Sequence, residues 1–395
     1  MLDKTTLVER LSSGAMFIAA GHLSLELSHN FLPVAYPLLI EELGLSYAQV
    51  GTVALVSILA GTLLQPLFGY LSDRFDSRLL MILSLFWLGT IMALTGLVGS
   101  YWLLLVVVAA GGLGSAAFHP AAAALASAVA GKRRGASMSI FSVGGNVGAA
   151  LSPLFVGAAL LQIGLRGTIV LIPVMWIISL FLFRQLWRLP AHSNLTTDGG
   201  TGSSDAVKIG PPLALILVVL IAASRSWFQS ALNTYLPEWL QSGGWSPEHA
   251  SILLSVLLAS VAVGSLTGGT LSDHIGRVPV VLLSFSLAAP IVWLLLNTQG
   301  ALQVVFIALC GVMIGATFPV TILMAQEAWP QAVGLASSLA IGLGWLPGGI
   351  GAWFVGVLAD RVSLTFGLTT LVAAPLVGLF AGLVFMRRYQ RSSSV

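Results

Sequence analysis

The sequence contains very little charge. Of its 395 residues, 17 are Lys or Arg and 14 are Asp or Glu, which together make 8%, whereas about a quarter of the residues in a soluble protein are charged. Hydrophobic residues make up 57% of the chain, and its mean hydropathy is +0.97. This composition excludes a soluble globular protein and predicts one that lies in a lipid bilayer. The basic residues are scattered, which excludes a nucleic-acid-binding patch.

Cysteine is also nearly absent. The single Cys310 lies inside an apolar run, so a disulfide framework and a cysteine-based metal site are excluded, and we expect a small core residue. The sequence shows no paired nucleophile and base, no metal-ligand set and no nucleotide-binding loop. We therefore expect neither an enzyme nor a bound cofactor or metal ion.

The chain does contain an internal repeat. The segment 69–78, GYLSDRFDSR, returns about 200 residues later as GTLSDHIGR over 269–277. Duplication in a very apolar chain is typical of transporters whose two halves move around a central site.

The apolar stretches predict the fold, because each is long enough to cross a bilayer, which takes about 20 residues. They fall at 14–40, 48–71, 79–99, 101–130, 135–161, 167–187, 211–241, 249–272, 278–298, 301–327, 332–358 and 364–386. We predict an all-α membrane protein with twelve transmembrane helices in two pseudo-symmetric six-helix bundles, residues 1–189 and 211–395. Residues 190–210, rich in Gly and Ser, are expected to form a flexible cytoplasmic linker.

Positive charge sets the predicted orientation. An even number of spans brings both termini to one side, and most Lys and Arg residues outside the spans then share that side, leaving only Arg166 and Arg361 opposite. Positively charged loops stay in the cytoplasm. We expect both termini to be cytoplasmic, the first span to be uncleaved, and the protein to lie in a bacterial-type inner (plasma) membrane.

Several motifs resemble a known family. The duplicated Gly-x-Leu-Ser-Asp-(Arg/His) loop resembles the signature loop of the major facilitator superfamily. Shorter motifs are similar to those of its fosmidomycin-resistance branch: His22-x-x-x-Glu26, Tyr36-Pro-Leu-Leu39, Leu64-Gln-Pro66, Phe118-His-Pro120, Ser139-Ile-Phe-Ser-Val-Gly-Gly-Asn146 and Ala325-Gln-Glu327. This resemblance covers the entire chain and implies the major facilitator fold, alternating access and proton-driven drug efflux.

Ionisable side chains inside a span cost a few kcal/mol or more, so each one is a functional candidate. On the first span, His22, Glu26, His29 and Asn30 recur at helical spacing and share one stripe. We predict that Glu26 carries the coupling proton and that His22 relays protons to it. The alternative role for His22 is structural, with its ring packed in the core and donating a hydrogen bond to a backbone carbonyl.

Arg225 is the one permanently charged basic side chain near the middle of a predicted span. Its planar fork suits a carboxylate, phosphate or phosphonate, so we predict that it binds the anionic part of a substrate. At about 1.5 Å of rise per residue, Glu26, Asn146 and Arg225 lie near the middle of their spans, where such transporters bind substrate. The alternative is that Glu26 and Arg225 pair and lock the two halves.

Further polar and aromatic residues of the spans complete the predicted substrate site. They are Asn30, Gln65, His119, Asn146, Trp227, Gln229, Asn233, Tyr235 and Trp345. A structural role is the alternative for His119, because Pro120 frees a backbone carbonyl that needs a donor. Packing is the alternative for the others.

The duplicated loop supplies the predicted gate. The aspartate of each copy can accept hydrogen bonds from a helix N-terminus and from the arginine that follows, Arg78 or Arg277, and so close the inner mouth. A solvated loop turn is the alternative. The gating candidates are Asp73, Arg74, Arg78, Asp273, Arg277 and Glu327.

Together these features predict a secondary transporter that exports a small anionic drug or metabolite, such as a fosmidomycin-like phosphonate, in exchange for protons. The first alternative is import of a small organic anion by proton or sodium symport. A membrane receptor or assembly factor without transport is the second, and no soluble signalling domain supports it. The expected partners are the substrate, protons and the bilayer, and we expect a monomer.

Overall fold

The computed structural model describes residues 4–129, 134–188, 212–330, 336, 340 and 344–390. These residues form helices with short connections, and no strand occurs among them. The helices gather into two compact units, the first formed by Met1–Leu43 and Val56–Gly202, the second by Gly44–Leu55 and Ser203–Val395. The predicted linker lies outside the described residues.

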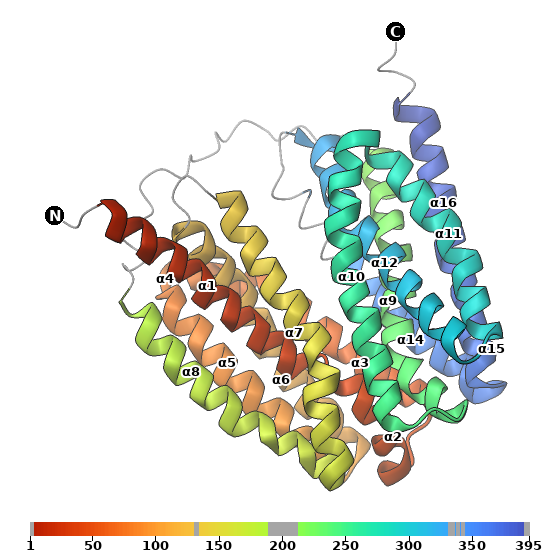
Figure 1. Cartoon of the computed structure of the whole chain (residues 1–395), viewed down its shortest axis with the longest axis horizontal. Helices are drawn as coiled ribbons and strands as arrows, with labels where there is room; N and C mark the ends of the chain where they lie inside the picture. Colours follow the sequence, from red (N-terminus) through yellow and green to blue (C-terminus); the bar gives the residue numbers. More distant parts are fainter. Residues whose placement is uncertain are drawn as a thin grey trace. The chain divides into compact units, whose positions relative to one another are not determined.

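The first unit is a bundle of long helices (Figure 1). Its helices are α1 (Lys4–His29), α2 (Leu32–Leu43), α4 (Gln65–Arg74), α5 (Ser77–Ala93), α6 (Tyr101–Val129), α7 (Arg134–Ile163) and α8 (Leu171–Leu186), with 3-10 turns at Leu94–Leu97 and Gly164–Val170. α1 packs along α7, and α5 packs against both α6 and α8. The buried side of α5 carries Met81, Leu85 and Leu88, spaced one turn apart as a helical apolar face requires.

The second unit is built in the same way (Figure 1). Its helices are α9 (Pro212–Ser242), α10 (Pro247–Ile275), α11 (Arg277–Asn297), α12 (Ala301–Ala328), α14 (Gly344–Arg361), α15 (Leu364–Thr369) and α16 (Ala373–Phe385), with short turns at Thr370–Val372 and Met386–Gln390. α10 packs along α12, and α9 along α14 and α16. Cys310 is fully buried in α12, which confirms that it is a core residue.

Nine stretches of the described residues are long and apolar enough to cross a membrane. One of them, Ser137–Leu186, is 50 residues long and covers two of the predicted apolar runs. The first and eleventh predicted runs are not among the nine. The first run is divided between α1 and α2, and the eleventh falls partly outside the described residues.

The first apolar run, 14–40, is divided between two helices. α1 ends at His29, and α2 begins at Leu32. The amide of Asn30 donates to the backbone carbonyl of Glu26 at 3.1 Å and to its carboxylate at 2.6 Å, which fixes the end of α1. Pro33 lies in the first turn of α2, where its missing N–H is not needed.

The second predicted span is also divided. α3 (Tyr47–Leu63) ends just before Leu64, and α4 starts with Pro66 in its first turn. Because proline has no backbone N–H and clashes with the preceding turn, a continuous helix through this point is unfavourable.

Small residues allow the helices to approach closely. A side-chain carbon added to Gly144 or Gly148 on α7 would overlap the backbone carbonyls of Ala19 and Leu23 on α1. Such contacts between backbones are the means by which membrane helices pack tightly.

The segment Gly44–Leu55, which contains the start of α3, belongs to the second unit although it comes from the N-terminal repeat. The Asp360 carboxylate on α14 accepts hydrogen bonds from the backbone N–H groups of Tyr47 at 2.7 Å and Ala48 at 2.9 Å. The Tyr235 hydroxyl on α9 donates to the carbonyl of Tyr47 at 2.8 Å. A carboxylate is favourable at a helix N-terminus, so Asp360 fastens the start of α3 to the second unit.

Candidate functional site

An acid and two histidines of the first unit lie together. Oε1 of Glu26 on α1 is 3.5 Å from Nε2 of His22, one turn earlier, and 3.6 Å from Nε2 of His119 on α6. The side chains of Glu26, His22 and His119 are 18%, 12% and 31% exposed. His119 is therefore the most accessible member of this cluster.

Both imidazole rings have their orientation fixed by the backbone. Nδ1 of His22 lies 2.8 Å from the carbonyl oxygen of Phe141, and Nδ1 of His119 lies 2.8 Å from that of Ser115. A carbonyl only accepts, so each Nδ1 carries the hydrogen, and in a neutral ring each Nε2 presents a lone pair to Glu26. With Glu26 ionised, three electron pairs would face one another. A proton or another cation between them turns this repulsion into attraction, so the cluster is suited to hold one.

The two alternatives for His22 are therefore compatible, since one ring nitrogen meets a backbone carbonyl and the other meets Glu26. Nδ1 of His119 also lies near a backbone carbonyl, but this is not the carbonyl that Pro120 frees and that the structural alternative requires. The carbonyl near His119 belongs to Ser115. The carbonyl that loses its helical donor, because Pro120 has no N–H, is that of Ala116.

Three neighbours hold the cluster in place. The ring of Phe141 stacks on His22 with the centroids 4.1 Å apart. Gly145 leaves room for the same ring, because an added side-chain carbon would overlap it. Asn30 donates to Oε2 of Glu26 at 2.6 Å, which leaves Oε1 turned to the two imidazoles. The predicted stripe on α1 thus brings together His22, Glu26 and Asn30.

Other predicted residues of the first unit make different contacts. Nε2 of His29 lies 3.0 Å from the hydroxyl of Ser57 on α3. The amide of Gln65 donates to the carbonyl of Gly61 at 2.9 Å, across the break between α3 and α4, which indicates a helix-end role. Asn146 lies half-buried on α7. Substrate contacts of Gln65 and Asn146 stay predictions.

Arg225 on α9 is buried, with 2% exposure. Its Nη1 donates to Oε1 of Gln229 at 2.6 Å. The rings of Phe318 and Trp345 flank the guanidinium, with centroids 4.9 Å and 4.8 Å from Cζ, as in cation–π contacts. No carboxylate among the described residues of the second unit lies within ion-pair distance of Arg225.

One face of α9 carries polar groups that lack partners. Arg225, Gln229 and Asn233 are spaced four residues apart and so share that face. Nε of Arg225 and Oδ1 of Asn233 are buried without a hydrogen-bond partner. Each such group costs about 1–3 kcal/mol, so this face is suited to a polar ligand that supplies the missing bonds.

Two predicted substrate residues of α9 lie elsewhere on the helix. The ring of Trp227 packs edge-on against Phe354 of α14, with centroids 6.4 Å apart, and its indole N–H is buried without a partner. Tyr235 is buried, and its hydroxyl bonds the backbone of α3. The contacts of Tyr235 indicate packing, and a substrate contact of Trp227 stays a prediction.

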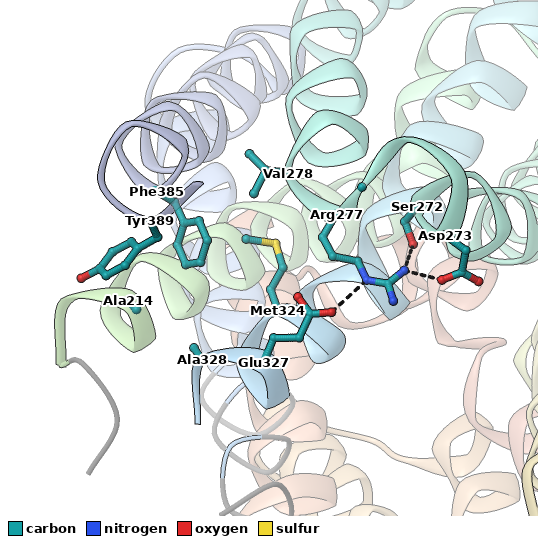
Figure 2. Close-up of a pocket in the computed structure, with 11 residues that line it drawn as sticks. Ala214, Ser272, Asp273, Arg277, Val278, Met324, Glu327, Ala328, Phe385 and Tyr389 are labelled. Atoms are coloured by element: carbon teal, nitrogen blue, oxygen red, sulfur yellow. Dashed lines mark hydrogen bonds and ion pairs between the residues drawn. The ribbon is translucent and has the colours of Figure 1, made fainter. Parts of the chain in front are cut away.

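Arg277 ties three helices together in the second unit (Figure 2). It begins α11 and bonds Asp273 at 2.5 Å and the Ser272 hydroxyl at 2.7 Å, both on α10, and Glu327 on α12 at 3.2 Å. These residues line a hollow of about 710 Å³. Their placement suits the predicted gate, and gating itself stays a prediction.

In the first repeat, Arg78 bonds a carboxylate that has no counterpart in the second repeat. Arg78 bonds Asp76, with Nε 2.9 Å from Oδ1 and Nη2 2.5 Å from Oδ2, and its guanidinium lies 4.7 Å from the ring centroid of Trp187. The second repeat has Gly276 in place of Asp76, with a φ of 93° that favours glycine. With no carboxylate at position 276, the side-chain partners of Arg277 are Ser272, Asp273 and Glu327.

Two gating candidates remain. Arg74 is exposed, and its guanidinium lies 4.4 Å from the ring centroid of Tyr70. The side chain of Asp73 lies outside the described part of the chain. The predicted bond between Asp73 and Arg78 is therefore untested.

Asp76 also caps α5, because its side chain accepts from the backbone N–H of Arg78. Its hydrogen bonds to the Arg78 side chain hold the pKa of Asp76 below its usual range. A carboxyl with a lowered folded-state pKa stabilises the fold above its unfolded pKa, and this contribution is lost as pH falls through the folded value.

Asp76→Ala is expected to lower the free energy of unfolding by about 0.5–2 kcal/mol at neutral pH, because it removes the cap. The difference from the wild type should shrink below pH about 4. Thermal unfolding of the wild type and the variant in detergent, at neutral pH and below pH about 4, measures this difference. Asp76→Asn keeps a capping oxygen and should cost less. A pH-independent difference would show that the charge of Asp76 contributes nothing.

Sequence reasoning did not single out Phe141, Phe318, Glu238 or Asp360. Oε1 of Glu238 accepts from the Tyr47 hydroxyl at 3.4 Å, beside the backbone that Asp360 holds. The criterion that selected Glu26, an acid inside an apolar run, also applies to Glu238. The two phenylalanines carry no such signal, because they matter only through the charged groups beside them.

These observations define a class of protein: a multi-span membrane transporter with two helical units encoded by a repeat, one carrying an acid–histidine cluster and the other a buried arginine. The chain belongs to the Major Facilitator Superfamily, whose model matches residues 18–242 and 218–394. Members of this family are membrane transporters and not enzymes.

Named relatives agree with this assignment. The chain is 28% identical to the fosmidomycin resistance protein of Escherichia coli (strain K12) over 92% of this chain and 90% of that protein. It is 29% identical to the uncharacterized MFS-type transporter YfnC of Bacillus subtilis (strain 168), over 89% of this chain and 88% of that protein. The resemblance to the fosmidomycin-resistance branch is thereby confirmed.

A solved structure shows the same fold. The chain is similar to a bacterial homologue of the human lysosomal transporter Spinster, with a TM-score of 0.82, 16% identity, and coverage of 96% of this chain and 97% of that one. This similarity establishes the major facilitator fold.

Proposed function

We propose that this protein exports a small organic anion, such as a fosmidomycin-like phosphonate, across the inner membrane in exchange for protons, by alternating access. Its relative in Escherichia coli is named a fosmidomycin resistance protein, which supports efflux of a compound of this kind. Arg225 and Gln229 bind the anionic group in this proposal, and Glu26 with His22 and His119 binds the proton.

The observation that carries the proposal is the environment of Arg225. A guanidinium has five N–H donors, and in the described residues only Gln229 accepts from it. Burial of such a cation is costly unless it is paired. A phosphonate or carboxylate would supply two parallel hydrogen bonds and a compensating charge, and the rings of Phe318 and Trp345 would exclude water around them.

The geometry of the Glu26 cluster supports proton binding in the first unit. Glu26 and two imidazole nitrogens share one space in which a proton is favourable, whereas no second group of this kind occurs in the described residues of the other unit. In this proposal, the anion and proton sites belong to different units. We propose that they are coupled through the rocking of the units during alternating access.

Transport by purified protein in liposomes tests the proposal. With an imposed pH gradient, fosmidomycin should accumulate on the acidic side, because each proton that runs down the gradient drives anion movement in the opposite direction. Accumulation on the alkaline side would instead establish proton symport, and accumulation driven only by sodium would establish sodium symport. Binding without flux would support a receptor and reject transport.

A further inference from the structure

Three potential metal ligands converge in the first unit. Nε2 of His22, Nε2 of His119 and one carboxylate oxygen of Glu26 all lie within 4.8 Å of one another. We propose that they form a binding site for a divalent transition-metal ion of the Zn²⁺ type. The spacing of residues along the sequence predicts no metal site, because these ligands come from two helices, α1 and α6, that are far apart in the chain.

The separations suit zinc. Zinc binds imidazole nitrogen at about 2.0–2.1 Å and carboxylate oxygen at about 2.0–2.2 Å, so neighbouring ligands in a tetrahedron lie about 3.4 Å apart. Oε1 of Glu26 is 3.5 Å from Nε2 of His22 and 3.6 Å from Nε2 of His119. An ion here can therefore reach Glu26 together with either imidazole, and it reaches all three once the two imidazole nitrogens, which lie within 4.8 Å of each other, move closer together.

The surrounding contacts are those of a metal site. A histidine that binds a metal almost always donates its other ring N–H to a carbonyl or carboxylate, and a ligating carboxylate is itself hydrogen-bonded. Nδ1 of His22 bonds the Phe141 carbonyl, and Nδ1 of His119 bonds the Ser115 carbonyl. The second oxygen of Glu26 accepts from Asn30. Each ligand is thus oriented by a partner that is not itself a ligand.

The donor types indicate which ion would bind. Two imidazoles and one carboxylate suit zinc, nickel or copper, whereas magnesium and calcium prefer oxygen ligands alone. A site with two histidines and one glutamate leaves a fourth position for water or an added group. His119 is the most exposed of the three ligands, at 31% of its side chain.

The proposal goes beyond transport, because it rests on the placement of ligand atoms and not on proton coupling. A bound ion would link α1 to α6 and occupy the electron pairs that Glu26 and the histidines present to one another. Added Zn²⁺ is accordingly expected to slow transport by the wild type.

Metal binding is measured on the whole chain, purified in detergent without a polyhistidine tag and stripped with a chelator. Titration calorimetry should show one Zn²⁺ site per chain, and Co²⁺ in its place should give the intense visible absorption of a four- or five-coordinate ion. Glu26→Gln and His119→Gln should each weaken binding by more than the about 10–100-fold that loss of an outer contact costs. The matched control is His249→Gln, an exposed histidine of the second unit, which should bind as the wild type does.

A measurement without substitutions guards against misfolded variants. Zn²⁺ should protect His22 and His119 of the wild type, and not His249, from modification by diethylpyrocarbonate. Absence of Zn²⁺ binding, binding that survives both substitutions, or no selective protection would overturn the proposal. A protein that binds Zn²⁺ here but moves no anion would refute the proposed function alone, and a proton-coupled transporter that binds no Zn²⁺ would refute this inference alone.

Discussion

Replacing Arg225 with alanine is expected to abolish substrate binding and transport. A hydrogen bond to a charged group contributes about 1.5–3 kcal/mol, so the loss of two such bonds to an anion should weaken binding by about 100-fold or more. Thermal-shift titration with fosmidomycin and related phosphonates measures the loss. The unfolding temperature of the ligand-free variant should not fall, because the substitution removes a buried charge without an ion-pair partner in its unit.

Two comparisons separate the role of this side chain from a general effect of charge. Arg225→Lys keeps the positive charge and loses the planar fork, so it should recover only part of the affinity. Arg361→Ala, an exposed arginine at the end of α14 in the same unit, should bind as the wild type does. If a ligand stabilised the wild type and Arg225→Ala equally, Arg225 would not be part of the anion site.

The overall fold could be predicted from the sequence because it follows from a long-range repeat and from apolar runs of membrane length. The points where helices break could not be predicted equally well. The end of α1 depends on the bonds that Asn30 makes to Glu26, and an apolar run carries no sign of such a local contact. Pro66 lies in the first turn after the second break, but a proline does not mark a break by itself, because α6 and α7 continue through Pro120 and Pro153.

The candidate sites were predictable where they depend on one helix. Helical spacing alone joins His22, Glu26 and Asn30, and it also joins Arg225 with Gln229. Contacts between helices were not predictable in the same way. His119 meets Glu26 only because α6 packs beside α1, so the sequence assigned it to the substrate site and not to the acid.

The placement of Gly44–Leu55 shows the same limit. Pseudo-symmetry assigns this segment to the N-terminal half, but its backbone is held by the Asp360 carboxylate and the Tyr235 hydroxyl of the second unit. These bonds use the backbone N–H and C=O groups of Tyr47 and Ala48, which are present in every residue other than proline. No residue type at 47 or 48 could therefore have indicated them.

Glu26→Gln is expected to eliminate proton-driven accumulation while it preserves exchange of substrate across the membrane. Glutamine has the shape of the protonated acid, and its amide can donate to the lone pairs of His22 and His119, so the cluster stays in its proton-loaded arrangement. The glutamine cannot bind and release a proton, so the pH gradient can no longer drive accumulation of the substrate.

Liposomes measure both processes. In wild-type protein that exchanges one proton for one monoanion, a gradient of one pH unit can drive accumulation of about tenfold, and Glu26→Gln should reduce it to none while counterflow of labelled substrate continues. His29→Gln is the matched control, because His29 lies on the same helix and bonds Ser57 instead of Glu26, so accumulation should persist. Undiminished accumulation in Glu26→Gln would place the coupling proton on another group. Loss of counterflow as well would show that Glu26 is needed for the movement of the units, because a glutamine of equal shape already satisfies both histidines.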